Sequence, residues 1–164
     1  MPRVERLDPA SWERLRRIRL RALDDAPDAF GSSAAAERDQ DQAEWHRLIG
    51  LGPWWLAVEG GDDVGMVAGG RRERDARTRW VYSMWVDRPW RGRDVAGALL
   101  DAVVDWARSD GAARLGLDVT DRVPRARRFY ERYGFVATGV VVPLPRDPSI
   151  ELAEMTYALV GDGR

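Results

Sequence analysis

The segment Met84–Leu100, MWVDRPWRGRDVAGALL, combines a strand-like stretch, an Arg/Gly turn and the start of a helix. A strand that runs through a tight turn into a helix brings free backbone N–H groups together at the helix N-terminus. These donors, with the positive end of the helix dipole, favour a phosphate. The segment therefore predicts a phosphate-binding loop, which would hold a cofactor by its phosphate groups.

The other apolar and turn residues predict the elements that position this loop. Asp8-Pro9 is typical of a helix start, with a side-chain cap before a proline, and Gly60-Gly61-Asp62 predicts a hairpin turn. The expected elements, in chain order, are strand 3–7, helix 9–23, helix 37–49, strand 54–59, strand 64–70, strand 80–86, helix 94–109, strand 114–119, helix 124–133, strand 135–142 and strand 150–159. This order predicts an α/β fold in which helices pack on a mixed sheet.

The composition bounds the class of protein. The chain has 164 residues, 45% hydrophobic and 32% charged, which suits one domain, 1–164, with a sizeable core. No apolar run approaches ~20 residues, so no membrane span is expected. The N-terminal MPRVERLDPA has no apolar signal-peptide core. The expected location is the cytoplasm.

The composition also excludes several kinds of site. The chain has no cysteine, which excludes disulfides, thiolate metal sites and a cysteine nucleophile. A single histidine, His46, disfavours a His-rich metal site or a His-based triad, so no metal is expected. A net charge of −1 argues against a nucleic-acid partner. The charged run Arg71–Arg79 has acids among its arginines and no interleaved aromatics, which favours a solvated hairpin loop.

Two sequence motifs resemble those of the GNAT superfamily of acyl-CoA-dependent N-acyltransferases, and they occur in the same order as in that family. The family's phosphate loop has the pattern Gln/Arg-x-x-Gly-x-Gly/Ala, and Arg91 and Ala96 match its first and last positions. The second motif is a tyrosine a few residues before Gly-Phe, which Phe129-Tyr130 and Gly134-Phe135 provide. The element order resembles that of the family over nearly the whole chain.

The resemblance implies a GNAT-like fold, with a central mixed, largely antiparallel sheet flanked by helices. The sheet is expected to splay where strand 80–86 parts from strand 114–119, so that the pantetheine arm of acetyl-CoA can pair with the open edge. The turn N–H groups then face the pyrophosphate, and Arg91 or Arg93 adds positive charge to it. The cofactor-binding residues that this implies are Trp85, Val86, Arg91, Gly92, Arg93, Asp94, Val95 and Ala96.

Two residues depart from the family pattern. Asp94 stands where the pattern has glycine, and a side chain there crowds the approach of the backbone to phosphate. Repulsion between its charge and a phosphate ~4 Å away costs about 1 kcal/mol in water and roughly 4 kcal/mol at a protein surface. Alternatively, Asp94 caps its own helix and points its carboxylate away. Val123 stands where many members carry an asparagine that hydrogen-bonds the pantetheine arm, a bond that valine cannot make.

The resemblance also suggests catalytic groups. Tyr130 is the candidate general acid, because a phenol with a pKa near ~10 can give a proton or a hydrogen bond to the departing CoA thiolate. Alternatively, Tyr130 is a core residue, since it shares a helical face with other aromatic residues. Some family members carry a glutamate base at the position of Trp80, which cannot serve. The remaining candidates for the general base are Glu154, Tyr82 and a bound water. Alternatively, Glu154 has a structural role.

The leading hypothesis is an N-acetyltransferase that moves an acetyl group from acetyl-CoA to a primary amine of a small molecule or peptide by direct transfer in a ternary complex. The alternative is a non-catalytic acyl-CoA-binding or sensing module, which the two departures and the missing carboxylate base favour. The acceptor groove is expected to be built by the first two helices and the loops 24–36 and 143–148. The acidic residues of this region either attract a cationic amine or are ordinary surface charges. Both a monomer and a homodimer fit the sequence, and dimers are frequent in such families.

Overall fold

The computed structural model describes residues 1–73 and 75–160, and these residues form a seven-stranded sheet in the order β1-β2-β3-β4-β5-β7-β6. Neighbouring strands are antiparallel, except β4 and β5, which are parallel. The strands are β1 (Arg3–Arg6), β2 (Trp54–Glu59), β3 (Asp62–Gly70), β4 (Thr78–Val86), β5 (Arg114–Thr120), β6 (Val136–Leu144) and β7 (Asp147–Ala158). The expected mixed, largely antiparallel α/β fold is confirmed.

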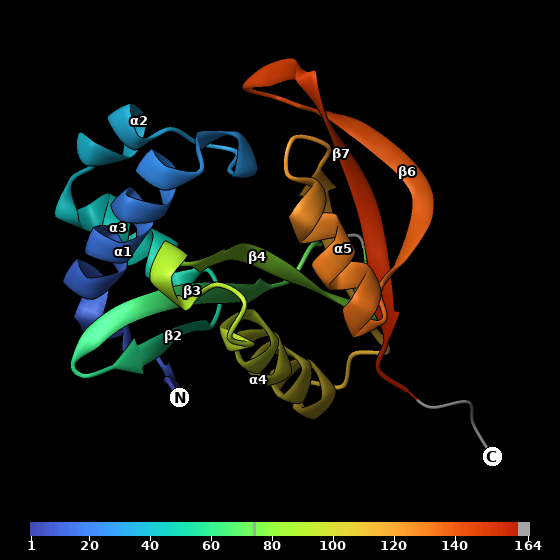
Figure 1. Cartoon of the computed structure of the whole chain (residues 1–164), viewed down its shortest axis with the longest axis horizontal. Helices are drawn as coiled ribbons and strands as arrows, with labels where there is room; N and C mark the ends of the chain where they lie inside the picture. The colour runs from blue at the N-terminus through green and yellow to red at the C-terminus, as the bar shows by residue number, and fades with distance from the viewer. Residues whose placement is uncertain (74, 161–164) are drawn as a thin grey trace.

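Helices cover both faces of this sheet. They are α1 (Trp12–Asp25), α2 (Ala34–Arg38), α3 (Gln42–Gly50), α4 (Val95–Ser109) and α5 (Pro124–Tyr133). Figure 1 shows α1, α2 and α3 together at one side of the molecule, and α5 with β6 and β7 at the other. Over the described ranges, no helix has both the length and the apolarity that a bilayer span requires.

Apolar side chains form a core on each face of the sheet. On one face, residues such as Val81 and Leu117 pack with α4 and α5. On the other face, residues such as Leu56 and Met66 pack with α1 and α3. Because successive strand residues point to opposite faces, β4 contributes to both cores. This holds β4 firmly in the middle of the molecule.

The sheet opens between β4 and β5, as the family resemblance implies. These strands pair only from Thr78↔Arg114 to Trp80↔Gly116. Near the same point β4 contains a bulge, because Tyr82 pairs with Ala68 and Trp85 with Met66, which leaves two residues of β4 opposite one of β3. The bulged residue Ser83 has a left-handed φ of 56°.

The helix expected at 37–49 is wrong in its bounds, because two helices, α2 and α3, occupy this region. The side chain of Ser33 caps α2, so this helix begins within the expected loop 24–36. The side chain of Asp41 accepts a hydrogen bond from the Glu44 N–H at 2.9 Å and begins α3. A strong N-cap of this kind starts a new helix rather than continuing the previous one.

The connections between β6 and β7 and between β3 and β4 differ in length from the loops expected there. The loop expected at 143–148 is shorter, because β6 extends to Leu144 and β7 begins at Asp147. β6 is an edge strand, and an edge strand tolerates proline, here Pro143. Residues 71–77 join β3 to β4 as the expected hairpin connection, and Arg74 among them lies outside the described residues. The expected solvated loop is wrong for Thr78 and Arg79, because these two residues belong to β4 and are buried.

Candidate active site

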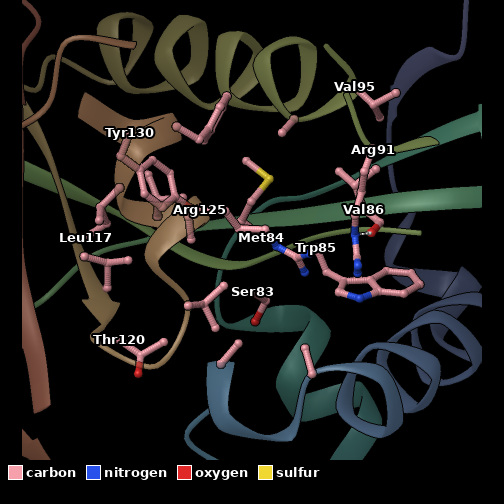
Figure 2. A pocket seen from close by; sticks show the side chains of 18 of the residues that line it. Ser83, Met84, Trp85, Val86, Arg91, Val95, Leu117, Thr120, Arg125 and Tyr130 are labelled. Atoms are coloured by element: carbon pink, nitrogen blue, oxygen red, sulfur yellow. Dashed lines mark hydrogen bonds between the residues drawn. The ribbon is translucent and has the colours of Figure 1, made fainter. Parts of the chain in front are cut away.

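A cavity of about 550 Å³ lies where β4 and β5 part. Figure 2 shows its walls, with Met84, Trp85 and Val86 on β4, Leu117 on β5 and Tyr130 on α5. Because the β4–β5 ladder ends at the start of this gap, the edge of β4 that faces the cavity can hydrogen-bond the amides of an extended ligand. The cavity therefore suits a long, amide-bearing molecule.

The turn before α4 forms one end of the cavity. Gly92 has a left-handed φ of 75°, which glycine adopts at little cost. Asp94 is the N-cap residue of α4 but makes no side-chain cap hydrogen bond within the described part of the chain. The N–H groups of Val95 and Ala96, in the first turn, thus receive no cap from the Asp94 side chain, and both residues line the cavity. Such a helix start attracts anions.

The two arginines that were expected to bind the phosphate, Arg91 and Arg93, make contacts with other residues of the protein. Arg91 lines the cavity, but its Nε donates to the Val86 carbonyl at 2.9 Å and its Nη2 donates to the Asp25 carboxylate. Arg93 is exposed, and its guanidinium lies 5.2 Å from the centroid of the Trp90 ring. Arg91 therefore ties the turn to β4 and α1, whereas Arg93 lies away from the cavity wall.

Tyr130 faces the cavity from the buried side of α5. Its ring makes edge contacts with Phe129 and Phe135, at centroid distances of 5.2 and 5.7 Å, and the residue is 8% exposed. Burial raises the pKa of the Tyr130 hydroxyl above its ordinary value of 10.0. The hydroxyl therefore keeps its proton at neutral pH and is available as a donor to a group in the cavity.

Comparison with known proteins agrees with this geometry. Residues 12–135 match the family described as the Acetyltransferase (GNAT) family, a span that includes β4, the turn, the cavity and Tyr130. This chain belongs to the GNAT acetyltransferase family. The resemblance drawn from the two motifs is confirmed.

Relatives of this GNAT protein include Mycothiol acetyltransferase from Beutenbergia cavernae, which is 34% identical over 86 residues. The match covers 52% of this chain and 29% of that relative, so the chain spans under a third of the relative's length. The structure of yncA from Salmonella typhimurium, solved with its cofactor acetyl-CoA, has a TM-score of 0.77 and 19% identity, covering 100% of this chain and 97% of that one. The structure of the ribosomal-protein-S18-alanine N-acetyltransferase from Escherichia coli has a TM-score of 0.70 and 17% identity, and the match also covers 100% of this chain and 97% of that one. At these identities the two structures show a shared fold.

The structure gives a second reason why the GNAT pattern has glycine at position 94. Asp94 has a left-handed φ of 60°, a conformation that costs a residue with a side chain more than it costs glycine. Its carboxylate lies over the first turn of α4, at the place that a Cβ at position 97 would take, so a residue larger than Gly97 would have to displace the Asp94 side chain. The capping alternative for Asp94 is not supported, because its side chain makes no cap hydrogen bond within the described residues.

Substitution of Asp94 is expected to tighten acetyl-CoA binding. Asp94→Gly should lower the Kd about tenfold, because a charge next to the phosphate is removed and the left-handed backbone is relieved. Asp94→Asn separates the two effects, since asparagine also tolerates this conformation but carries no charge. Calorimetric titration of the three forms measures the change. Weaker binding by both variants would rule out repulsion by Asp94.

Asp25, at the end of α1, connects that helix to the turn of the GNAT site. Its carboxylate accepts hydrogen bonds from Trp85 Nε1 at 3.0 Å, from Arg88 Nε at 2.7 Å and from Arg91. Burial opposes the ionisation of this carboxyl, but the three hydrogen bonds outweigh burial and lower its pKa from 3.8 to about 2. Asp25 therefore remains charged and holds the turn in place over the whole neutral and mildly acidic range.

This carboxylate predicts a pH dependence of stability. A group whose pKa is lowered by folding stabilises the fold above its unfolded pKa and loses that contribution as pH falls. The free energy of unfolding should therefore decrease between about pH 4 and about pH 2, and Asp25→Asn should flatten that part of the curve. Urea denaturation of both forms across this range is the measurement. The same slope in both forms would contradict the assignment.

Asp118 is a residue of the cavity wall that the sequence analysis did not single out. It lies on β5, and its Oδ2 accepts from Arg72 Nη2 at 2.9 Å. Glu154 pairs with it across the β5–β7 ladder and accepts from the Thr138 hydroxyl at 3.1 Å. Tyr82 also lines the cavity. The alternation along β5, in which Leu115, Leu117 and Val119 share one face, was the signal that places Asp118 on the other face.

Proposed function

We propose that this chain works as a single N-acetyltransferase domain, which moves the acetyl group of acetyl-CoA directly to a primary amine in a ternary complex. The observation that carries the proposal is the cavity between β4 and β5. One end of this cavity meets the free N–H groups at the start of α4, and its wall includes the buried phenol of Tyr130. A phosphate site, an open strand edge and a proton donor thus meet in one space.

The residues of the cavity fit acetyl-CoA. Gly92 leaves open space at the turn, where an added Cβ would meet no atom within 4 Å, so a pyrophosphate can approach the backbone. Arg125, at the start of α5, also lines the cavity and adds positive charge. When bound, acetyl-CoA supplies an activated thioester carbonyl. Val123 forms part of the wall without a polar group for the pantetheine arm, so the β4 edge is left to provide those hydrogen bonds.

Two residues are proposed to move protons. Tyr130 donates its hydroxyl proton, or a hydrogen bond, to the departing thiolate. Asp118 takes the proton of the attacking amine, because it is an acidic residue that lines the cavity. Glu154, its cross-strand neighbour, is the alternative base. An acidic group in the wall also removes one argument for a non-catalytic acyl-CoA-binding module, the lack of a carboxylate base, and leaves the departures at Asp94 and Val123 as the other two.

Three acids of the acceptor side are held in ion pairs. Asp24 pairs with Arg38 at 2.6 Å, and Glu37 pairs with Arg19 at 2.5 Å. Asp25 pairs with Arg88 and Arg91. The charges of these three carboxylates are therefore neutralised by arginines, which argues against their attracting a cationic amine. Recognition of the amine is then left to the groups of the cavity wall.

Release of free CoA thiol against a panel of amines tests the proposed function. The panel should include a polyamine, an aminoglycoside antibiotic, amino acids and a peptide with a free N-terminus, with mass spectrometry of the acetylated product. Initial-rate lines that intersect when both substrates are varied are expected for a ternary complex. Asp118→Asn and Glu154→Gln form a matched pair, and the larger loss of kcat is expected from Asp118→Asn. Binding of acetyl-CoA without thiol release for any amine would favour the sensing module.

A further inference from the structure

Arg72, in the connection between β3 and β4, bridges β4 and β5 where they part. Its Nε donates to the Tyr82 hydroxyl at 2.9 Å, and its Nη2 donates to Asp118 Oδ2 at 2.9 Å. Tyr82 and Asp118 each lie two residues beyond Trp80↔Gly116, the last backbone pair of the two strands. The guanidinium therefore joins the strands at the position where the main-chain ladder has ended.

A stacked platform fixes this guanidinium. The Cζ atom of Arg72 lies 3.4 Å from the centroid of the Trp80 ring, a cation–π arrangement. Trp80 lies against β5 because Gly116 has no side chain, and a Cβ at position 116 would come within 2.7 Å of the ring. Trp80 is 5% exposed, so the platform is part of the packed interior. Arg72 thus has one defined position over the sheet.

The two hydrogen bonds decide which atoms of Tyr82 and Asp118 face a ligand. Because the Tyr82 oxygen accepts from Arg72, its hydroxyl proton is free to be donated elsewhere. Because Arg72 holds Oδ2 of Asp118, the other oxygen, Oδ1, is left to accept from a ligand. We propose that Arg72 is a positioning residue, which holds the Asp118 carboxylate in the orientation that takes the proton from the acceptor amine. This inference deepens the proposed function and rests on it.

The transfer balances with these groups. The C–N bond forms and the C–S bond breaks, an amine proton passes to Asp118 Oδ1, and the Tyr130 proton passes to the sulfur. Asp118 faces Tyr82 on β4, Glu154 on β7 and Arg72 on the connection. Loss of Arg72 would leave the Asp118 carboxylate without the donor that fixes its orientation. The rate of the proton transfer from the amine then depends on Arg72.

The test compares Arg72→Gln with Arg71→Gln. The two arginines are adjacent and lose the same charge, but Arg71 Nε donates to Asp110, at the end of α4. With an accepted amine, Arg72→Gln should lower kcat about 10- to 100-fold, which is less than the roughly 100- to 10,000-fold contribution of the acid–base group itself, because Asp118 is still present. The KM for the amine should change little, because an interaction that matters only in the transition state lowers kcat rather than substrate binding. Arg71→Gln should stay within about twofold of the wild type, since surface charges contribute little.

Two further measurements separate positioning from a purely structural role. Neither variant should change the Kd for acetyl-CoA, because neither arginine contacts the turn. Arg72→Lys keeps the charge but not the two-pronged bridge, so kcat should stay low in this variant as well. A wild-type kcat in Arg72→Gln, or equal losses of kcat in Arg72→Gln and Arg71→Gln, would overturn the inference and leave the proposed function intact. A wild-type protein without turnover would overturn both.

Discussion

Replacing Tyr130 by phenylalanine is expected to lower kcat by about 100-fold, within the range that acid–base catalysis contributes, and to leave the Kd for acetyl-CoA unchanged. The substitution removes only the hydroxyl, so the edge contacts of the ring with Phe129 and Phe135 remain. The departing thiolate would then lack its proton donor. Steady-state kinetics with an accepted amine, together with calorimetric titration of acetyl-CoA, measure the two quantities separately.

Tyr133→Phe is the matched control for this substitution. Tyr133 lies one helical turn further along α5, and its hydroxyl donates to Asp101 Oδ1 at 2.5 Å, between α5 and α4. Loss of this hydroxyl should change stability slightly and leave kcat within about twofold, because exposed contacts contribute little. Full turnover by Tyr130→Phe would show that Tyr130 is a core residue only.

Replacing Glu37 by glutamine is expected to lower the free energy of unfolding by about 3–5 kcal/mol, the range for breaking a buried ion pair. Glu37 is 2% exposed and accepts from Arg19 Nε at 2.5 Å and from Nη2 at 3.1 Å. Glutamine would leave the Arg19 charge buried without its anion. Urea denaturation followed by tryptophan fluorescence gives the change.

The effect should extend to the active site. Arg19 Nη1 also donates to the Ser83 hydroxyl at 2.7 Å, and Ser83 is the left-handed residue of the β4 bulge. The ion pair between α1 and α2 therefore helps to hold the bulge that lines the cavity. Asp24→Asn is the control, because the Asp24–Arg38 pair is exposed and such pairs contribute about 0–1 kcal/mol. Equal destabilisation by both substitutions would argue against a special role for the buried pair.

The fold could be predicted where local signals and tertiary packing agree. Helix α5 has the expected bounds, because Pro124 begins it and Gly134, with a φ of 123°, ends it. The single helix expected over 37–49 was wrong, because Asp41 lies within a run of helix-forming residues and its side chain caps the start of a new helix, α3. The expectation was also wrong at Pro143, because the tolerance for that proline depends on β6 being an edge strand, which the sequence does not show.

The site could be predicted where it depends on main-chain geometry. The Gly92 turn and the open β4 edge follow from the segment Met84–Leu100 and the family pattern. The partner of Arg91 could not be predicted, since Asp25 lies 66 residues away and is brought to it by the packing of α1 on β4. Asp118 was missed because its importance depends on where β4 parts from β5, a feature of pairing rather than of composition.

The central claim is that the cavity between β4 and β5 binds acetyl-CoA, and thermal unfolding with saturating acetyl-CoA tests it most directly. A ligand at about 100 times its Kd stabilises the native state by about 2.7 kcal/mol, which raises the Tm of a chain of this size by about 5–10 °C. The account predicts this rise, a one-site calorimetric isotherm, and a larger rise for Asp94→Gly. An unchanged Tm and no heat of binding at saturating acetyl-CoA would contradict it.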